Sequence, residues 1–326
     1  MAKLVLGVGS SHSPMLNMPA ADWPLYAGPD LRLPHYDRSG RRISYEELKR
    51  AADPAIAAFV TPEEMARRHA RNEAAIAHLA AVIAAARLDA LIVVGDDQEE
   101  IFSPANQPAA AIYWGETIPS LPFPADIDRL PFLRRAYQRN CEPEGERLYP
   151  VDAALARHLI EALVDREFDV AALKALPGGV GEGHALGFVH KRLMAAAPIV
   201  PIVLNTYYPP NQPTPRRCYR LGQAIAAAVA TFPGDARVGM LASGGLSHFV
   251  VYEDLDREVM RALREKDAAA LQNLPRSRLE AGSSEIRNWI CLAGAVEPLS
   301  VDWLEYVPCY RSLAGTGTAM CFATWQ

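Results

Sequence analysis

Continuous apolar runs alternate along the chain with longer amphipathic stretches. Lys3 to Gly9 and Leu88 to Val94 have the unbroken apolar character of strands that are buried on both faces. Residues 61 to 87, between them, are rich in alanine and open with Thr-Pro-Glu-Glu, a cap followed by an initiating proline and first-turn acids, which predicts one long helix. This rhythm predicts an α/β fold with a central, mostly parallel or mixed sheet flanked by helices.

The same pattern continues toward the C-terminus. Further strands are predicted at Ile199 to Asn205 and Val238 to Ser243, and the segment Tyr306 to Trp325 is expected to close the sheet by packing. Helices are predicted at Val151 to Val164, Cys218 to Thr231, Asp254 to Asp267 and Ser284 to Ala295.

One long segment, residues 17 to 60, interrupts the alternation. It contains a predicted turn at Asp37 to Gly40 and a predicted short helix at Tyr45 to Ala57. So long an interruption is more often a lid or a subunit contact than filler. We therefore interpret residues 1–326 as a single domain with residues 17–60 as a lid or subunit-contact insertion.

Composition narrows the possible partners. The 326 residues carry a net charge of −5, which disfavours nucleic acid and anionic membrane surfaces, so a small molecule is the expected partner. No apolar stretch reaches the roughly 20 residues of a membrane helix, and Leu4 to Gly9 is too short for a signal-peptide core. Five widely spaced cysteines without a CxxC pair indicate reduced thiols and a cytoplasmic location.

Five short segments bring polar residues to the ends of hydrophobic runs. Loops at strand ends are where an α/β scaffold keeps its chemistry, and histidine with carboxylate is a metal-ligating combination, so these segments together predict an enzyme with a metal site. They are Gly7 to Pro14, Gly95 to Phe102, Gly181 to Phe188, Ser243 to Phe249 and Glu280 to Trp289.

The first segment also begins like a dinucleotide-binding turn. After Gly7-Val8-Gly9, however, the third glycine is missing, and Pro14 stands where the phosphate-binding helix would continue. A nucleotide site is therefore disfavoured. His12 remains as a ligand candidate, against the alternative that a lone histidine is structural.

Ser247-His248 follows a pair of glycines but lacks the GxSxG pattern of a hydrolase nucleophile. His248 therefore fits the role of a general acid or base better than a place in a hydrolase triad. The alternative is that it caps the helix that follows. Glu285 lies at the start of a predicted helix, where an acid is ordinarily a dipole partner. In the company of His12 and His248 it completes two histidines and one carboxylate, the facial triad of non-haem Fe(II) oxygenases.

The chain resembles the class III extradiol ring-cleavage dioxygenases, the LigB-type superfamily that includes protocatechuate, gallate and 3-O-methylgallate dioxygenases. The resemblance runs through Gly7 to Leu16, Asn205 to Gly222, Ser243 to His248 and Ala281 to Trp289. It implies a LigB-like fold with the active site in strand-end loops.

Residue by residue, the resemblance implies that His12 and Glu285 are iron ligands and that His248 is the catalytic acid/base. His184 matches the family's further active-site histidine, and His190, six residues later, is its alternative.

One position departs from the family pattern. Gln98 stands where the family has its second iron-binding histidine, and a neutral amide oxygen is a weaker donor than imidazole. Asp97 could serve as the ligand if the loop shifts by one residue, and Asp96 is the less favoured substitute. Alternatively, the run from Asp96 to Glu100 is a solvated acidic turn, although four carboxylates in so short a segment favour a cation nearby.

The implied activity is Fe(II)-dependent extradiol cleavage, in which both atoms of O₂ enter a catecholic aromatic acid and the ring opens. The expected partners are a small aromatic diol, O₂ and further copies of the chain in a homo-oligomer. An altered metal site catalysing a different oxidation or a metal-assisted hydrolysis is the alternative, and a non-enzymatic relative is disfavoured because an idle site needs no such cluster of groups. Substrate-binding candidates are Tyr207, Tyr208, Arg217 and Arg311, together with Arg216. The alternative is that each is structural, or that Arg216 or Arg217 faces a partner subunit.

Overall fold

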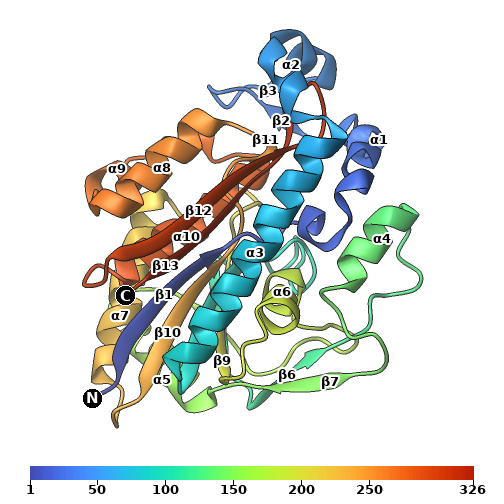
Figure 1. Ribbon diagram of the computed structural model, residues 1–326. Coiled ribbons are helices and arrows are strands. Elements are labelled where there is room, and N and C mark those ends of the chain that lie inside the picture. Colours follow the sequence, from blue (N-terminus) through green and yellow to red (C-terminus); the bar gives the residue numbers. More distant parts are fainter.

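A nine-stranded mixed sheet forms the centre of the computed structural model, which describes residues 1–326 (Figure 1). The strand order is β11-β13-β1-β10-β4-β9-β5-β8, and β12 pairs with the outer side of β13. The strands are β1 (Lys3–Ser10), β4 (Ala90–Asp96), β5 (Ala110–Tyr113), β8 (Ala171–Leu173), β9 (Ile199–Leu204), β10 (Arg237–Ser243), β11 (His248–Val250), β12 (Val301–Tyr310) and β13 (Thr316–Trp325).

The four central strands β1, β10, β4 and β9 run parallel, whereas β13 is antiparallel to β1 and β5 is antiparallel to β9. Every residue of β4 is buried, as expected for a strand covered on both faces. The predicted strands at β1, β4, β9 and β10 are confirmed, and so is the α/β architecture with a mixed sheet.

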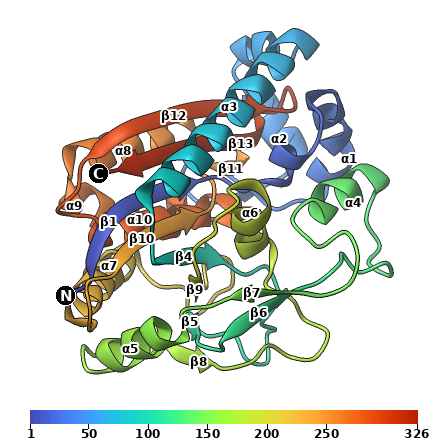
Figure 2. The same ribbon diagram turned by 60° about the horizontal axis from the view of Figure 1, so that its bottom comes forward.

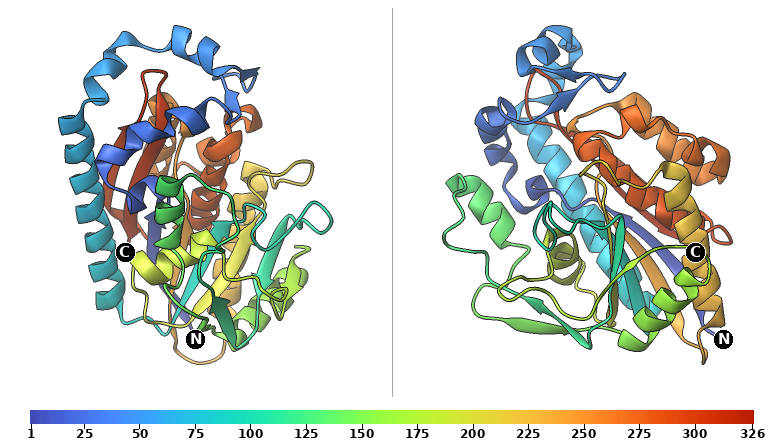
Figure 3. Two further views of the ribbon diagram at one scale, coloured as in Figure 1. Left: turned by 90° about the vertical axis from the view of Figure 1, so that its right-hand side faces the viewer. Right: turned by 180° about the vertical axis from the view of Figure 1, so that it is seen from behind.

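Helices cover the sheet in two layers (Figures 2 and 3). One core of 47 buried residues joins a face of the sheet to α5 (Ala153–Val164), α7 (Pro215–Thr231), α8 (Glu253–Glu265), α9 (Ala268–Gln272) and α10 (Ile286–Ala295). A second core of 30 buried residues lies on the opposite face, under α3 (Pro62–Ala86), α6 (His184–Arg192) and α4 (Pro131–Gln138). The sheet therefore separates two apolar cores.

The long helix α3 follows its sequence signals closely. The Thr61 hydroxyl accepts a hydrogen bond from the Glu64 backbone N–H at 3.2 Å, as an N-cap should. The predicted helix at Ser284 begins as α10 at Ile286, because a 3₁₀ turn, η5 (Ala281–Glu285), precedes it.

No helix of the structure is both long enough and apolar enough to cross a membrane, and all five cysteines are free thiols.

The insertion 17–60 is a string of short elements beyond the carboxyl ends of the central strands, at the top of Figure 1. The prediction of one helix over Tyr45 to Ala57 is wrong beyond Ala51, because Pro54 forces the residues before it into an extended conformation. The elements are η1 (Pro14–Asn17), η2 (Ala20–Tyr26), α1 (Ala27–Asp30), β2 (His35–Tyr36), β3 (Arg42–Ile43), α2 (Tyr45–Ala51) and η3 (Pro54–Phe59). A separate two-stranded antiparallel sheet, β6 (Thr117–Ser120) and β7 (Arg147–Pro150), whose strands are connected through α4, precedes α5.

Gly9 has a packing role that explains the glycine-rich turn without a nucleotide. A Cβ placed on Gly9 would lie 2.2 Å from the Trp289 ring, which is fully buried between β1 and α10. Only glycine lets the strand approach the indole this closely.

We expect Gly9→Ala to lower the free energy of unfolding by about 1 to 3 kcal/mol, because the methyl group overpacks the Trp289 contact. Urea denaturation of both proteins measures the loss. Gly28→Ala is the matched control, since nothing lies within 4 Å of a Cβ there. Equal midpoints for Gly9→Ala and the parent protein would contradict the packing argument.

Candidate metal centre

The site forms where the parallel strands end together. Ser10 of β1 pairs with Ser243 of β10, Val94 of β4 pairs with Ala242, and Asp96 pairs with Leu204 of β9. Since these strands run in the same direction, the residues that follow them meet at one edge of the sheet. Two of the five segments are not strand-end loops as expected: Gly181 to Phe188 opens α6 and Glu280 to Trp289 opens α10.

A cavity of about 210 Å³ opens at this edge. It brings together the predicted residues His12, Gln98, His184, Tyr207, His248, Glu285 and Arg311. The insertion contributes Tyr26, Pro29 and Leu33 to the wall, and the region of α4 contributes Arg129, Leu133 and Tyr137. The cavity therefore collects histidines and carboxylate from the sheet under a cover of insertion and α4 residues.

His12 presents one ring nitrogen to the cavity in a defined tautomer. Its Nδ1 lies 2.9 Å from the Ser243 hydroxyl, and that hydroxyl donates its proton to the Ala185 carbonyl at 2.8 Å. The hydroxyl has only one proton, so it must accept from His12 Nδ1–H. In the neutral imidazole Nε2 therefore holds the lone pair, and this buried atom has no hydrogen-bond partner within the protein.

His184 is oriented in the same way by a carboxylate. Its Nδ1 lies 2.5 Å from Glu100 Oε2, and its backbone N–H donates to the other oxygen of Glu100. Burial lowers the His184 pKa, but the Glu100 carboxylate more than offsets this, so the pKa rises to about 10. Its Nε2 lies 3.8 Å from Asp96 Oδ2.

Asp96, the last residue of β4, lies between these two imidazoles. His12 Nε2 is 3.6 Å from Asp96 Oδ1, and ligand atoms of His12, Asp96 and His184 all lie within 4.8 Å of one another. Burial, followed by the charge of Glu285, raises the Asp96 pKa to about 6. A cation at this point would relieve both influences, because it stabilises the ionised carboxylate.

Glu285 completes the cluster from the start of α10. Its Oε2 lies 3.4 Å from His12 Nε2 and accepts the Gly245 backbone N–H at 2.7 Å, while Oε1 accepts the Tyr207 hydroxyl at 2.6 Å. Burial alone would raise its pKa, but His248 and His12 outweigh burial and hold the pKa well below the usual value. Glu285 is therefore an ionised carboxylate next to an unpartnered imidazole nitrogen.

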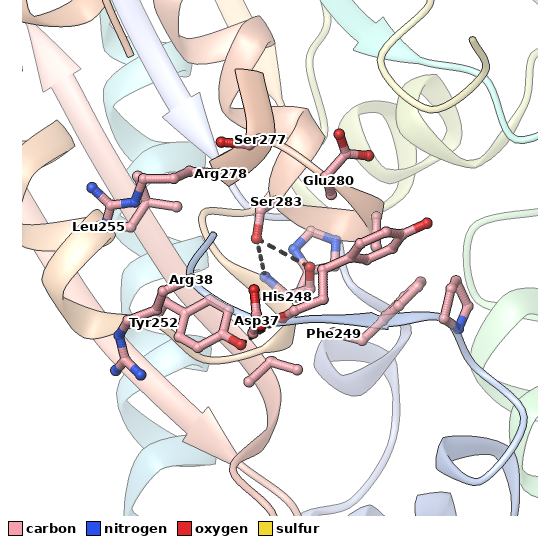
Figure 4. Close-up of a pocket in the computed structure, with 14 residues that line it drawn as sticks. Asp37, Arg38, His248, Phe249, Tyr252, Leu255, Ser277, Arg278, Glu280 and Ser283 are labelled. Atoms are coloured by element: carbon pink, nitrogen blue, oxygen red, sulfur yellow. Dashed lines mark hydrogen bonds between the residues drawn. The ribbon is translucent and has the colours of Figure 1, made fainter. Parts of the chain in front are cut away.

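His248 also points its Nε2 inward. Its Nδ1 donates to the Leu246 carbonyl at 2.8 Å, and Nε2 lies 3.1 Å from Glu285 Oε1 and 3.4 Å from the Tyr207 hydroxyl. Ser283 Oγ bonds with both the backbone N–H and the carbonyl of His248, as the dashed lines in Figure 4 show. These contacts from η5 hold the His248 backbone and leave Nε2 to face the cavity.

The structure distinguishes the three residues considered for the position of the missing histidine, Gln98, Asp97 and Asp96. Asp97 turns away from the centre, since its carboxylate accepts the backbone N–H groups of Glu100, Ile101 and Phe102. Gln98 lines the cavity from an exposed position and contacts Asp96 Oδ2 at 3.4 Å. Asp96, the less favoured of the carboxylates in the sequence, is the one that lies beside the histidines.

Several other predicted residues lie outside the cavity. Arg217 stacks over the Phe168 ring at 4.0 Å and donates to the Glu167 carbonyl, and Arg216 contacts Asn273. Tyr208 is adjacent to Tyr207 but does not line the cavity. His190 pairs with Glu182 at 2.6 Å, so His184 is the histidine of this segment that faces the site.

Sequence reasoning missed the residues that orient the histidines. Ser243 begins one sequence motif and Glu100 belongs to an acidic run, and neither position indicates by itself that the side chain fixes an imidazole, as both do in the structure. A signal was present for Asp96, because it directly ends a buried strand in register with its neighbours. Which strand-end side chain points inward depends on neighbouring strands and could not be read from the loop.

The chain belongs to the LigB family. A family model described as "Catalytic LigB subunit of aromatic ring-opening dioxygenase" matches residues 53–320, which is most of the chain and includes the sheet strands from β4 to β12 and the first half of β13. The predicted LigB-type resemblance and fold are confirmed by this match. His12 precedes the matched region, and the other cavity residues of the metal cluster lie inside it.

Two curated relatives match over shorter stretches. The chain is 35% identical to gallate dioxygenase of Pseudomonas putida over 106 residues, which are 30% of this chain and 29% of that protein. It is 33% identical over 98 residues to 2,3-dihydroxyphenylpropionate/2,3-dihydroxicinnamic acid 1,2-dioxygenase of Comamonas testosteroni, which is 30% of each chain. Among solved structures, an uncharacterized protein of Escherichia coli K12 aligns with a TM-score of 0.45 and 15% identity, over 76% of this chain and 91% of that one.

We expect Ser243→Ala to weaken divalent metal binding roughly 10- to 100-fold, because His12 loses the acceptor that sets its tautomer and ring orientation. Competition with a fluorescent chelator measures the dissociation constant. Ser10→Ala is the matched control, since this buried neighbour pairs with Ser243 in the sheet and bonds only the Ser11 carbonyl. Unchanged affinity in Ser243→Ala would remove the tautomer argument.

Proposed function

We propose that this protein is an Fe(II)-dependent extradiol dioxygenase that opens the ring of an aromatic diol. One observation carries the proposal: His12, His184 and His248 are each held through Nδ1 and turn Nε2 toward the carboxylates of Asp96 and Glu285. Family membership supports the reaction class. The matched stretches cover less than a third of each curated relative, so the activity is inferred from the site's chemistry together with the family.

The donor set fits a divalent transition metal. His12, Asp96 and Glu285 would hold the ion, with His184 Nε2 on the other side of Asp96. When bound, Fe(II) supplies a Lewis-acidic, redox-active centre at which a diol and O₂ can meet. The unpartnered His12 Nε2 and the buried pair of carboxylates are what this chain offers to it.

His248 is proposed as the catalytic acid and base. Because Nδ1–H is engaged by the Leu246 carbonyl, neutral His248 has its lone pair on Nε2, where it can accept a proton from a substrate hydroxyl. The same atom can return the proton as the ring opens. Both oxygen atoms of O₂ remain in the product, so the reaction needs no external reductant.

Asp96 in place of an imidazole would change the centre's charge. A site with two carboxylates is more anionic than one with two histidines and a single carboxylate, and this favours a harder, more oxidised ion. That departure keeps a second candidate function, metal-assisted hydrolysis or another oxidation at the same centre. Oxygen consumption coupled to loss of the diol distinguishes the two.

The surroundings of the centre support three further proposals. Tyr26, Pro29 and Leu33 line the cavity, which fits the insertion 17–60 acting as a lid over the substrate. Free cysteines fit a reducing, cytoplasmic location. A homo-oligomer is proposed from the family resemblance, and light scattering of the purified chain tests it.

The first experiment measures metal content and oxygen consumption together. We expect anaerobically purified protein reconstituted with Fe(II) to hold one ion per chain and to consume O₂ with protocatechuate, gallate or 3-O-methylgallate. A ring-opened product with both atoms of ¹⁸O₂ incorporated identifies extradiol cleavage. Bound metal without O₂ consumption on any diol would shift the assignment to the hydrolytic candidate.

His248→Ala is expected to retain the metal and lose roughly 10²- to 10⁴-fold in kcat, because the proton acceptor is removed while the ligands remain. Steady-state O₂ uptake and elemental analysis of the same sample give both values. His78→Ala, an exposed histidine on α3, serves as the control. Full turnover in His248→Ala would defeat the proposed role.

Two variants, Asp96→Asn and Gln98→Ala, decide which residue replaces the family's second histidine. We expect Asp96→Asn to lose most of its bound metal, as His12→Ala and Glu285→Ala do, because each removes a group of the central cluster. Gln98→Ala should keep the metal, since its side chain is exposed and contacts only Asp96. The reverse result, with loss in Gln98→Ala and retention in Asp96→Asn, would return the ligand role to Gln98.

A further inference from the structure

Two arginines line the cavity, Arg311 and Arg129. A carboxylate compensates the charge of Arg311 but not that of Arg129. Arg311 is buried and forms two hydrogen bonds with Asp30, from Nε at 3.1 Å and from Nη2 at 2.5 Å. Asp30 is fully buried, and Thr316 donates a further hydrogen bond to it. The charge of Arg311 is therefore already matched, and its role is to tie the insertion to the end of β12.

Arg129 is the arginine without such a partner. It lies in the exposed segment before α4, and no carboxylate is paired with it at ion-pair distance. Its guanidinium lies over the Tyr137 ring, 5.2 Å from the ring centre, and both residues line the cavity. Tyr137 in turn stacks on Phe123, and this contact holds the ring over which the Arg129 guanidinium lies.

Carboxylates lie close to the histidines of the cavity. Glu285 lines it, and Asp96 and Glu100 lie behind His12 and His184, so an anionic substrate meets repulsion unless a positive charge lies along its path. A guanidinium whose donors are free binds a carboxylate in bidentate fashion. Arg129 is exposed and lines the same cavity as His12, His184 and His248, so a small molecule in this cavity can contact both the guanidinium and the histidines.

We infer that Arg129 is the residue that binds an anionic substituent of the substrate and so selects the acid over an uncharged analogue of the same diol. This inference rests on the proposed function, which supplies the diol. Arg129 is a specificity-determining residue here, because it lies on the cavity wall and away from the cluster that holds the reacting atoms. Its loss should weaken binding of the acid and leave the chemical step intact.

The test compares one ring with and without its charge. Protocatechuate and its methyl ester share the same diol and differ in the carboxylate. We expect Arg129→Gln to lower kcat/KM for the acid roughly 10- to 100-fold, through KM, because a charged hydrogen-bond pair is lost. The ester should be turned over as in the parent protein, and the dependence of KM on ionic strength should disappear for the acid.

Arg139→Gln is the matched control. Arg139 follows α4, is exposed, and does not line this cavity, so the variant removes the same charge from the same region without touching the wall. It should leave the acid and the ester unaffected. An equal loss in Arg139→Gln would show that only the net charge matters and would overturn the assignment to Arg129.

Binding of both compounds is measured anaerobically by calorimetry, so that the inference and the proposed function fail separately. Selective loss of acid binding in Arg129→Gln, with no turnover by the parent protein, would preserve the anion site and overturn the dioxygenase assignment. Turnover by the parent protein with no difference between the acid and the ester in Arg129→Gln would overturn the inference alone. A parent protein that neither binds nor converts the acid would overturn both.

Discussion

The structure depends on the burial of two carboxylates, Asp96 and Glu285, against three imidazoles at one edge of the sheet. Isolated buried charges are costly, and these are compensated by histidines, backbone N–H groups and the Tyr207 hydroxyl. Asp96 nevertheless has its pKa raised to about 6 by burial and by the neighbouring charge of Glu285. A bound cation would compensate the negative charge that the neighbouring groups leave on these two carboxylates. Such compensation accounts for the burial of so many ionisable groups at one point.

The parallel strands make that concentration of polar groups possible. β1, β10, β4 and β9 end in register, so side chains that are hundreds of residues apart meet without long loops. Close packing beneath them, with Gly9 against Trp289, keeps the strand ends rigid. The positions of the site residues are thus fixed by a sheet that is buried on both faces.

A second set of hydrogen bonds turns this cluster into an oriented one. Ser243, Glu100 and the Leu246 carbonyl each engage one Nδ1, and as a result all three Nε2 atoms face the same space. The insertion and α4 then cover that space and add the wall on which Arg311 is neutralised and Arg129 is free. Under the proposed function, the sheet edge supplies the reacting groups, and its cover supplies the group that selects the substrate.

The sequence by itself determined the α/β class, the four central strands and the long helix α3, because burial periodicity and local capping are encoded within short windows. Its motifs and the family resemblance predicted His12, His184, His248 and Glu285 as site residues, and these four side chains line one cavity. The sequence could not determine that Asp96 faces the histidines while Asp97 caps its own turn, nor that Arg217 packs on Phe168 far from the cavity. Those outcomes depend on which side of a strand end or helix meets a partner distant in sequence. Only the tertiary structure decides them, since the register between strands and the packing of the insertion set the direction of each side chain.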